Sequence, residues 1–209
     1  MRMNRTVLTL GALLSGLALV PAMAIGQDVA PPGFGLGLSA GAITLSPEEG
    51  QREWGASFAG SARYSWPSGL QLVGGVSYGF LDAKEVAGFA VDAKRNVLGI
   101  FLDPRLILNV NARTAAPYIG AHIAFLSHSL DSELAGNDLK LSGTGWDFAG
   151  VIGVLMRLSD QLAFDAFGTF GIAAFGEGDL EVGGEPFTVD GPTTFTASLA
   201  VGLVYSFGG

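Results

Sequence analysis

Alternation between large apolar side chains and small or polar ones is the feature of this 209-residue sequence that most restricts its fold. Near the C-terminal end every second position is apolar, and these positions are Phe195, Ala197, Leu199, Val201, Leu203, Tyr205 and Phe207. The positions between them are mostly small or polar, such as Thr196, Ser198 and Gly202. Because successive side chains of a β-strand point to opposite faces, this period of two predicts a strand with one bulky apolar face and one small face.

Seven upstream segments show the same division, at residues 34–41, 57–66, 70–80, 98–106, 119–125, 146–157 and 162–172. The ionisable residues of these segments fall on the face opposite the bulky side chains, and they are Arg63, Asp103, Arg105, His122, Asp147, Arg157 and Asp165. Bulky apolar residues suit a lipid-facing wall, and small residues suit the interior of a narrow barrel. We therefore predict an all-β fold, an eight-stranded antiparallel up-and-down transmembrane β-barrel, in which the charged residues form a polar network in the lumen.

The first 24 residues have the pattern of a secretory signal peptide. Arg2 and Arg5 precede the uncharged apolar segment 7–20, and Ala22-Met23-Ala24 fits a small-x-small cleavage site. The apolar segment is shorter than the roughly 20 residues that a membrane-spanning helix needs. We predict a cleaved signal peptide at residues 1–24, a short periplasmic lead at 25–33 and the barrel at 34–209.

The connections between the predicted strands alternate in length. Tight turns are expected at Trp66–Gly69 and Ser159–Gln161, with a somewhat longer one at 109–117. Long polar loops are expected at Ser46–Trp54, Asp82–Arg95, Ser127–Ser142 and Gly176–Thr193, and they contain most of the acidic residues, Glu53 included. Since outer-membrane barrels have short periplasmic turns and long external loops, we place the acidic loops outside the cell.

Aromatic residues near the strand ends predict two girdles at the membrane interfaces. One girdle is expected to contain Tyr64, Trp66, Tyr118, Tyr205 and Phe207, and the other Phe80, Phe125, Trp146 and Phe195. Pro104 cannot donate to a ladder hydrogen bond, so a bulge or irregularity is expected there.

Composition excludes several kinds of site. The chain has no cysteine, which excludes disulfides and cysteine-ligated metals. It has only two histidines, which argues against a histidine-rich metal centre. The net charge of −8 argues against a nucleic-acid partner. We expect no cofactor, no metal site and no catalytic residue.

The architecture and the closing strand resemble the OmpA/OmpX-like family of small outer-membrane β-barrels. The resemblance covers Phe34 to Phe207. It implies that the barrel-assembly machinery reads a C-terminal sorting signal, formed here by Val201, Leu203, Tyr205 and Phe207. It also implies outer-membrane lipid and lipopolysaccharide as surroundings. Members of the family serve as structural barrels, adhesins, narrow pores and, in related barrels, lipid-modifying enzymes, so the fold does not select an activity.

Four functions stay open on the sequence alone. We favour a monomeric, non-enzymatic outer-membrane barrel that serves envelope structure or surface interaction through its acidic loops. The first alternative is a narrow porin-like channel, although an eight-stranded lumen is only just wide enough for its own side chains. A lipid A-modifying enzyme would need His128, Ser127 or Ser129 and Asp131 to meet, yet adjacent strand residues point to opposite faces. A soluble lipocalin-like barrel is the last alternative.

Overall fold

The computed structural model describes residues 29–47, 51–86, 89–134 and 137–207. Its strands are β1 (Gly33–Pro47), β2 (Glu53–Ser65), β3 (Leu70–Val86), β4 (Phe89–Ile107), β5 (Ala115–Leu134), β6 (Asn137–Arg157), β7 (Leu162–Phe175), β8 (Gly178–Val182), β9 (Glu185–Val189) and β10 (Thr193–Ser206). Within the described ranges, no helix is long and apolar enough to span a membrane.

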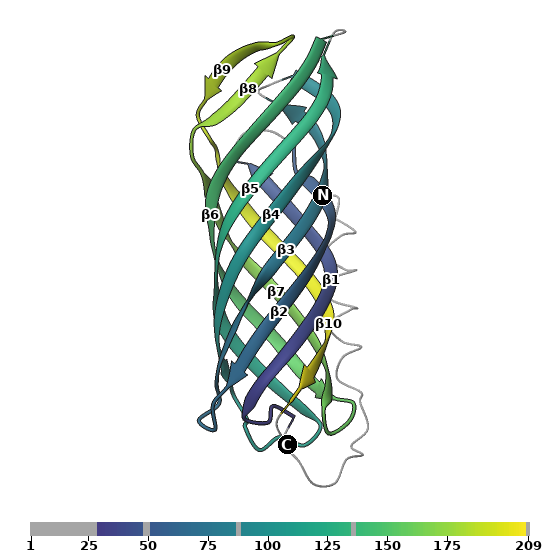
Figure 1. The fold of residues 1–209 in the computed structure, drawn as a ribbon, viewed down its shortest axis with the longest axis vertical. Coiled ribbons are helices and arrows are strands. Elements are labelled where there is room, and N and C mark those ends of the chain that lie inside the picture. The colour runs from purple at the N-terminus through teal and green to yellow at the C-terminus, as the bar shows by residue number, and fades with distance from the viewer. Residues whose placement is uncertain (1–28, 48–50, 87–88, 135–136, 208–209) are drawn as a thin grey trace, which may run out of the picture.

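Eight of these strands close into a tilted antiparallel barrel (Figure 1). Each of β1 to β6 pairs with the next strand along the chain, and β7 pairs with β10 on its other side. The barrel closes where β1 meets β10, in a ladder that runs from Gly35↔Ser206 to Pro47↔Thr194. The predicted eight-stranded antiparallel barrel is confirmed.

The two faces of the wall follow the alternation in the sequence. Leu38 on the outer face is 74% exposed, whereas Asp103 on the inner face is 2% exposed. The outward residues of β10 include Leu199, Val201 and Leu203, all of them exposed. The barrel therefore has an apolar outside, which suits lipid, and charged groups inside.

Two segments expected as loops are instead paired strand. Residues 82–86 and 89–95 lie in β3 and β4. Residues 127–134 and 137–142 lie in β5 and β6, whose ladder continues to Leu134↔Asn137. A row of exposed cross-strand neighbours alternates in charge across this region, in the order Asp82, Lys94, Asp131, Lys140 and Glu181. Opposite charges on neighbouring strands stabilise a sheet. Polar composition therefore marks where these strands leave lipid, and not where they end.

The segment 176–193 also contains strands that the sequence analysis did not predict. Strands β8 and β9 form a hairpin, and β8 continues the sheet from the upper part of β6. Gly183 and Gly184 connect them with φ angles of 59° and 89°, which only glycine adopts readily. The hairpin rises at the upper end of the barrel in Figure 1.

The irregularity expected at Pro104 takes a milder form than a bulge. The β4–β5 ladder omits Asp103 and Pro104, but its register is the same on both sides, from Leu102↔Ile123 to Arg105↔Gly120. The β3–β4 ladder has its register shift at the opposite end of β3, between Ala83 and Glu85, whereas Pro104 pairs with Leu72.

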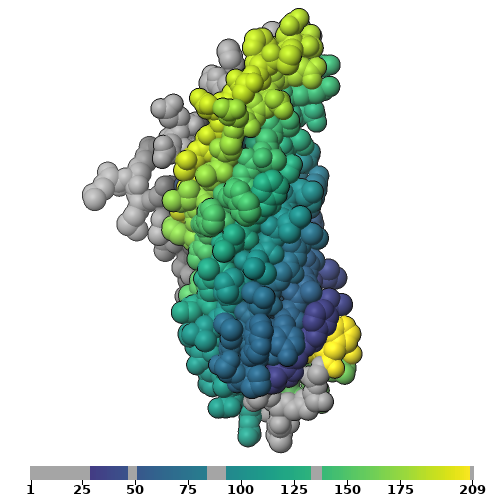
Figure 2. All heavy atoms as spheres, turned by 60° about the vertical axis from the view of Figure 1, so that its left-hand side comes forward, coloured from purple at the N-terminus to yellow at the C-terminus, as the bar shows by residue number. Residues whose placement is uncertain are grey.

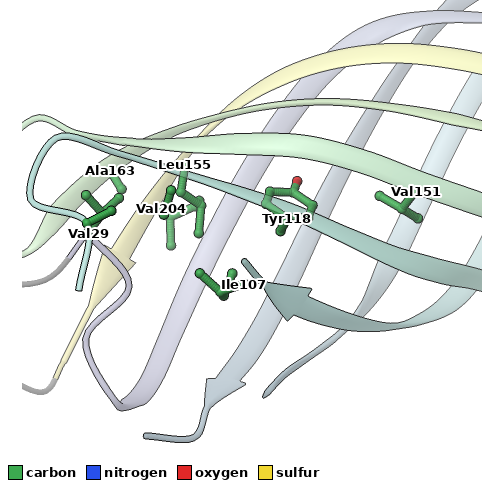
Figure 3. Packing of buried hydrophobic residues seen from close by; sticks show 9 residues of the cluster. Val29, Ile107, Tyr118, Val151, Leu155, Ala163 and Val204 are labelled. Atoms are coloured by element: carbon green, nitrogen blue, oxygen red, sulfur yellow. The ribbon is translucent and has the colours of Figure 1, made fainter. Parts of the chain in front are cut away.

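Apolar clusters fill the lumen at several levels. At the lower end of Figure 1, the first cluster consists of Val29, Ile107, Ala112, Ala116, Tyr118, Val151, Leu155, Ala163 and Val204 (Figure 3). Val29 enters from the segment before β1, and its N–H donates to the Ala112 carbonyl oxygen at 2.9 Å. A second cluster lies higher, around Leu45, Leu81, Val97 and Leu126. Along β4, Arg105 and Asp103 lie between Ile107 of the first cluster and Val97 of the second, so a charged layer separates the two.

Candidate functional site

Asp165 of β7 is the centre of the charged layer. Its Oδ2 accepts hydrogen bonds from Arg63 Nη2 and Arg105 Nη1, each at 3.2 Å. Its Oδ1 accepts a hydrogen bond from the Tyr118 hydroxyl at 2.7 Å. All four side chains are buried. The carboxylate therefore joins β2, β4 and β5 to β7 across the lumen.

Arg105 extends the layer along β4 and over two aromatic rings. Its Nη2 donates to Asp103 Oδ2 at 2.9 Å, and its Nη1 also donates to the Tyr118 hydroxyl at 3.1 Å. Its guanidinium carbon lies 4.9 Å from the centre of the Tyr118 ring and 5.2 Å from that of Phe167. Carboxylates and ring faces together compensate for the desolvation of this cation.

His122 connects this group to the other side of the barrel. Its Nδ1 lies 2.7 Å from Asp103 Oδ1, and its Nε2 lies 3.9 Å from Asp147 Oδ2. The Thr196 hydroxyl donates to Asp147 Oδ1 at 3.0 Å. The contacts thus continue from β4 through β5 and β6 to β10.

The structure brings together six of the seven residues of the expected polar network. These six are Arg63, Asp103, Arg105, His122, Asp147 and Asp165. The seventh, Arg157, is the last residue of β6, where it contacts Asp160 and donates to the Ser159 carbonyl oxygen at 3.2 Å. Arg157 therefore lies beside the turn at the lower end of the barrel.

Tyr118 corrects the expected aromatic girdle. Its side chain is 0% exposed and lies in the lumen, not at the membrane interface. The alternation along β5 predicts this inward orientation, because Tyr118 shares a face with His122 and lies on the face opposite Ile119. Gly153 makes room for the ring, since a Cβ at that position would lie 2.5 Å from the Tyr118 hydroxyl oxygen.

A cavity of about 120 Å³ adjoins the charged layer. Its polar lining includes Arg63, Asp103, His122, Asp147 and Thr196. This volume holds water or a small ion and is below the roughly 300 Å³ of a typical small-molecule pocket. No group of three or more potential metal ligands occurs among the described residues.

A second polar cluster lies inside the barrel beyond the exposed aromatic pair Phe125–Trp146, towards the upper end. Arg95 donates to both carboxylate oxygens of Glu53, from Nε at 2.9 Å and from Nη2 at 3.0 Å. Its Nη1 lies 3.2 Å from His128 Nδ1. Glu53 and Arg95 were both expected in external loops, but Glu53 begins β2 and Arg95 lies within β4. The inside of the wall remains ordered and ion-paired where its outside has become polar.

The same region separates the residues of the hypothetical catalytic triad. Ser127, Ser129 and Asp131 are exposed on the outer face, whereas His128 is buried on the inner face. The His128 ring packs edge-on against Phe175, with ring centres 4.8 Å apart. Neither serine is therefore oriented towards the imidazole.

His128 is expected to remain neutral down to acidic pH. Burial and the adjacent Arg95 guanidinium lower its pKa from 6.5 to about 4. The folded state then binds this proton less readily than the unfolded chain, so stability falls as pH drops from about 6.5 towards 4. NMR titration of the folded protein should give a His128 midpoint near 4, and Arg95→Gln should raise it. A wild-type midpoint near 6.5 would contradict this assignment.

Comparison with known proteins places these features in a family. Residues 10–207 match the family model of the outer membrane protein beta-barrel domain. The chain belongs to this family. As an outer membrane β-barrel protein, it directs its apolar outer face to lipid. We take the lower end of Figure 1, where β1 begins and β10 ends, as the periplasmic end, because the polar extensions of the wall and the β8–β9 hairpin lie at the other end and such barrels have their longer segments outside. No curated protein matches the chain.

Solved structures of similar fold are also outer-membrane proteins. Neisserial surface protein A is 20% identical, with a TM-score of 0.56, over 84% of this chain and 97% of its own. A major outer membrane protein from Thermus thermophilus is 14% identical, with a TM-score of 0.51, over 83% of this chain and 99% of its own. The attachment invasion locus protein of Yersinia pestis is 11% identical, with a TM-score of 0.48, over 84% of this chain and 100% of its own. At these identities the likeness concerns the fold.

Proposed function

We propose that this outer membrane β-barrel protein is a non-enzymatic, non-conducting barrel that supports the envelope and offers its external sheet as an interaction surface. The observation that carries the proposal is the filled lumen. An apolar cluster occupies the periplasmic mouth, and an ion-paired layer crosses the barrel above it. With the lumen filled, the external part of the sheet is the surface available for interaction.

Closure of the periplasmic mouth argues against the channel alternative. Val29 and Leu155 are buried in the apolar cluster at this mouth, and Figure 3 shows them grouped with Val204 and Ala163. The charged layer above them is held by three hydrogen bonds to Asp165. A hydrated ion would have to displace both apolar and ion-paired groups to pass.

Planar-bilayer recording tests this proposal directly. The refolded wild-type protein should give no steady open-channel current. The double variant Val29→Asp, Leu155→Asp places two charges in the apolar cluster and should produce leak currents, because unpaired buried charges draw in water. Leu38→Ala, on the lipid-facing side of β1, is the matched control and should remain silent. Steady single-channel steps in the wild type would overturn the proposal in favour of a channel.

The enzyme alternative has less support. The serine and carboxylate candidates and His128 lie on opposite faces of one strand, and nucleophilic catalysis needs base and nucleophile within hydrogen-bond reach. We therefore propose no catalytic residue and no cofactor.

Export and assembly complete the proposal. The predicted signal peptide at residues 1–24 lies outside the described residues, and we retain it as a prediction. The apolar outer face of the last strand, with Val201, Leu203, Tyr205 and Phe207, is proposed as the signal read by the barrel-assembly machinery. Lipid and lipopolysaccharide would surround a barrel that we take to be monomeric.

A further inference from the structure

The β8–β9 hairpin is attached to the rest of the protein along one side. Four residue pairs, from Leu139↔Val182 to Ser142↔Asp179, join β8 to β6. Within the described part of the chain, β9 pairs with β8 alone and ends the sheet. The space-filling view shows this region projecting at the upper end of the molecule (Figure 2). The hairpin thus has a face and an edge that the described barrel does not cover.

The charge of this segment has one sign. Residues 176–193 contain no lysine or arginine, and their acidic residues are Glu177, Asp179, Glu181, Glu185 and Asp190. A surface with a concentrated negative charge attracts cationic partners and repels a second copy of itself. Antiparallel pairing of two such hairpins would bring like charges together, so a second copy of this chain is a poor occupant.

The inward face of the hairpin is apolar. Directly paired residues share a face of the sheet, so Leu180 and Phe187 lie together, as do Val182 and Glu185. This face continues that of Leu139, which is buried in the apolar cluster at the top of the barrel. Phe187 is nevertheless 54% exposed, and its hairpin pairs with residues 139–142 of β6, beyond Trp146 of the predicted upper aromatic girdle. An exposed aromatic side chain beside a carboxylate suits a ligand that has an apolar group and a cation close together.

The free edge of β9 is poorly suited to adding another strand. The two-residue Gly183–Gly184 turn makes Val182 and Glu185 the hydrogen-bonded closing pair. The next residue, Pro186, therefore directs its backbone away from β8 and has no N–H to offer there. A partner would gain more from the apolar face than from the edge.

We infer that the inward face of the β8–β9 hairpin, centred on Phe187 and Glu185, binds a basic amphipathic peptide segment of a partner protein. An apolar side chain of the partner would pack on Phe187, and a lysine or arginine would pair with Glu185. The remaining acidic residues would steer the approach and be screened by salt. This inference rests on the proposed surface-interaction function and makes it specific.

The test uses the full-length protein in nanodiscs of zwitterionic lipid. The probe is a fluorescent 12-residue peptide of alternating lysine and leucine. The control peptide has glutamate in place of lysine. The lysine peptide should bind, and Phe187→Ala should weaken it about tenfold, the effect of an interface anchor. Glu185→Gln should weaken it several-fold, whereas Thr188→Ala, on the opposite face of β9, should leave affinity unchanged. Empty nanodiscs correct for binding to lipid, and the heat-dependent gel shift verifies that each variant is folded.

Each other outcome has a defined meaning. Equal binding of the lysine peptide to wild type and to folded Phe187→Ala would overturn the site and leave only a general electrostatic surface. Equal binding of both probes would overturn the charge argument. A dimer that Phe187→Ala dissociates would assign the face to a second copy and also overturn the inference. None of these results bears on conductance, so the proposed closed barrel is judged separately.

Discussion

Replacing Asp165 with alanine should reduce the free energy of unfolding by about 3–5 kcal/mol, the usual cost of removing one partner of a buried ion pair. The carboxylate neutralises Arg63 and Arg105 and accepts the Tyr118 hydroxyl. Its removal leaves the Arg63 cation without this counter-charge and Arg105 with Asp103 as its carboxylate partner, in a space closed by apolar side chains. The measurement is the urea midpoint of the folded-to-unfolded gel shift in detergent micelles.

Asp160→Ala is the matched control, since Asp160 also contacts an arginine, Arg157, but its side chain is 75% exposed. Exposed ion pairs contribute about 0–1 kcal/mol, so the control should move the midpoint little. Asp165→Asn should fall between the two, because the amide oxygen still accepts hydrogen bonds while the negative charge is lost. Similar midpoints for Asp165→Ala and Asp160→Ala would show that the layer contributes little to stability.

The second large effect is expected from a single methyl group. In Gly153→Ala the new Cβ would lie 2.5 Å from the Tyr118 hydroxyl oxygen and 2.8 Å from the Ala166 carbonyl oxygen. Overpacking of this kind costs about 1–3 kcal/mol, and movement of the ring would also weaken the hydrogen bond to Asp165. We expect Gly153→Ala to lower both the urea midpoint and the yield of refolded protein.

Gly60→Ala provides the same substitution without the collision. A Cβ at Gly60 would meet only Leu38 Cδ2, at the ordinary contact distance of 3.8 Å. Its midpoint should equal that of the wild type or exceed it slightly, since alanine restricts the unfolded chain more than glycine does. Equal stability of the two variants would mean that the Tyr118 ring moves aside without cost.

The alternation of side chains was sufficient to predict the barrel and the inward position of the charged residues. A pattern with a period of two indicates directly which face of the sheet each side chain occupies, and lipid tolerates no charge on the outer face. The predictions were wrong where residue type or the polarity of neighbouring residues was given more weight than this alternation. Tyr118 was assigned to a girdle because it is aromatic and close to a strand end, although its parity matched that of His122. Glu53 and Arg95 were assigned to loops because polar residues surround them.

The pairing inside the lumen could not be derived from the sequence. Asp165 meets Arg63 and Arg105 across the barrel, from strands that are not hydrogen-bonded neighbours of β7. Such contacts depend on the stagger with which the sheet closes, and local patterns do not encode that stagger. The β8–β9 hairpin had a weak signal in the Gly183–Gly184 pair between short alternating segments. The pairing of β8 with β6 had no corresponding signal in the sequence.

The hydrogen bonds between β8 and β6 have a consequence for anything that meets this protein from outside. The segment 176–193 is largely built into the same sheet as the barrel, so a visiting molecule encounters a surface with its shape already set. Little chain entropy then remains to be lost on contact. An immunogen made from the excised segment would lack the β6 scaffold, and antibodies raised against it would recognise a different shape from the one in the intact protein.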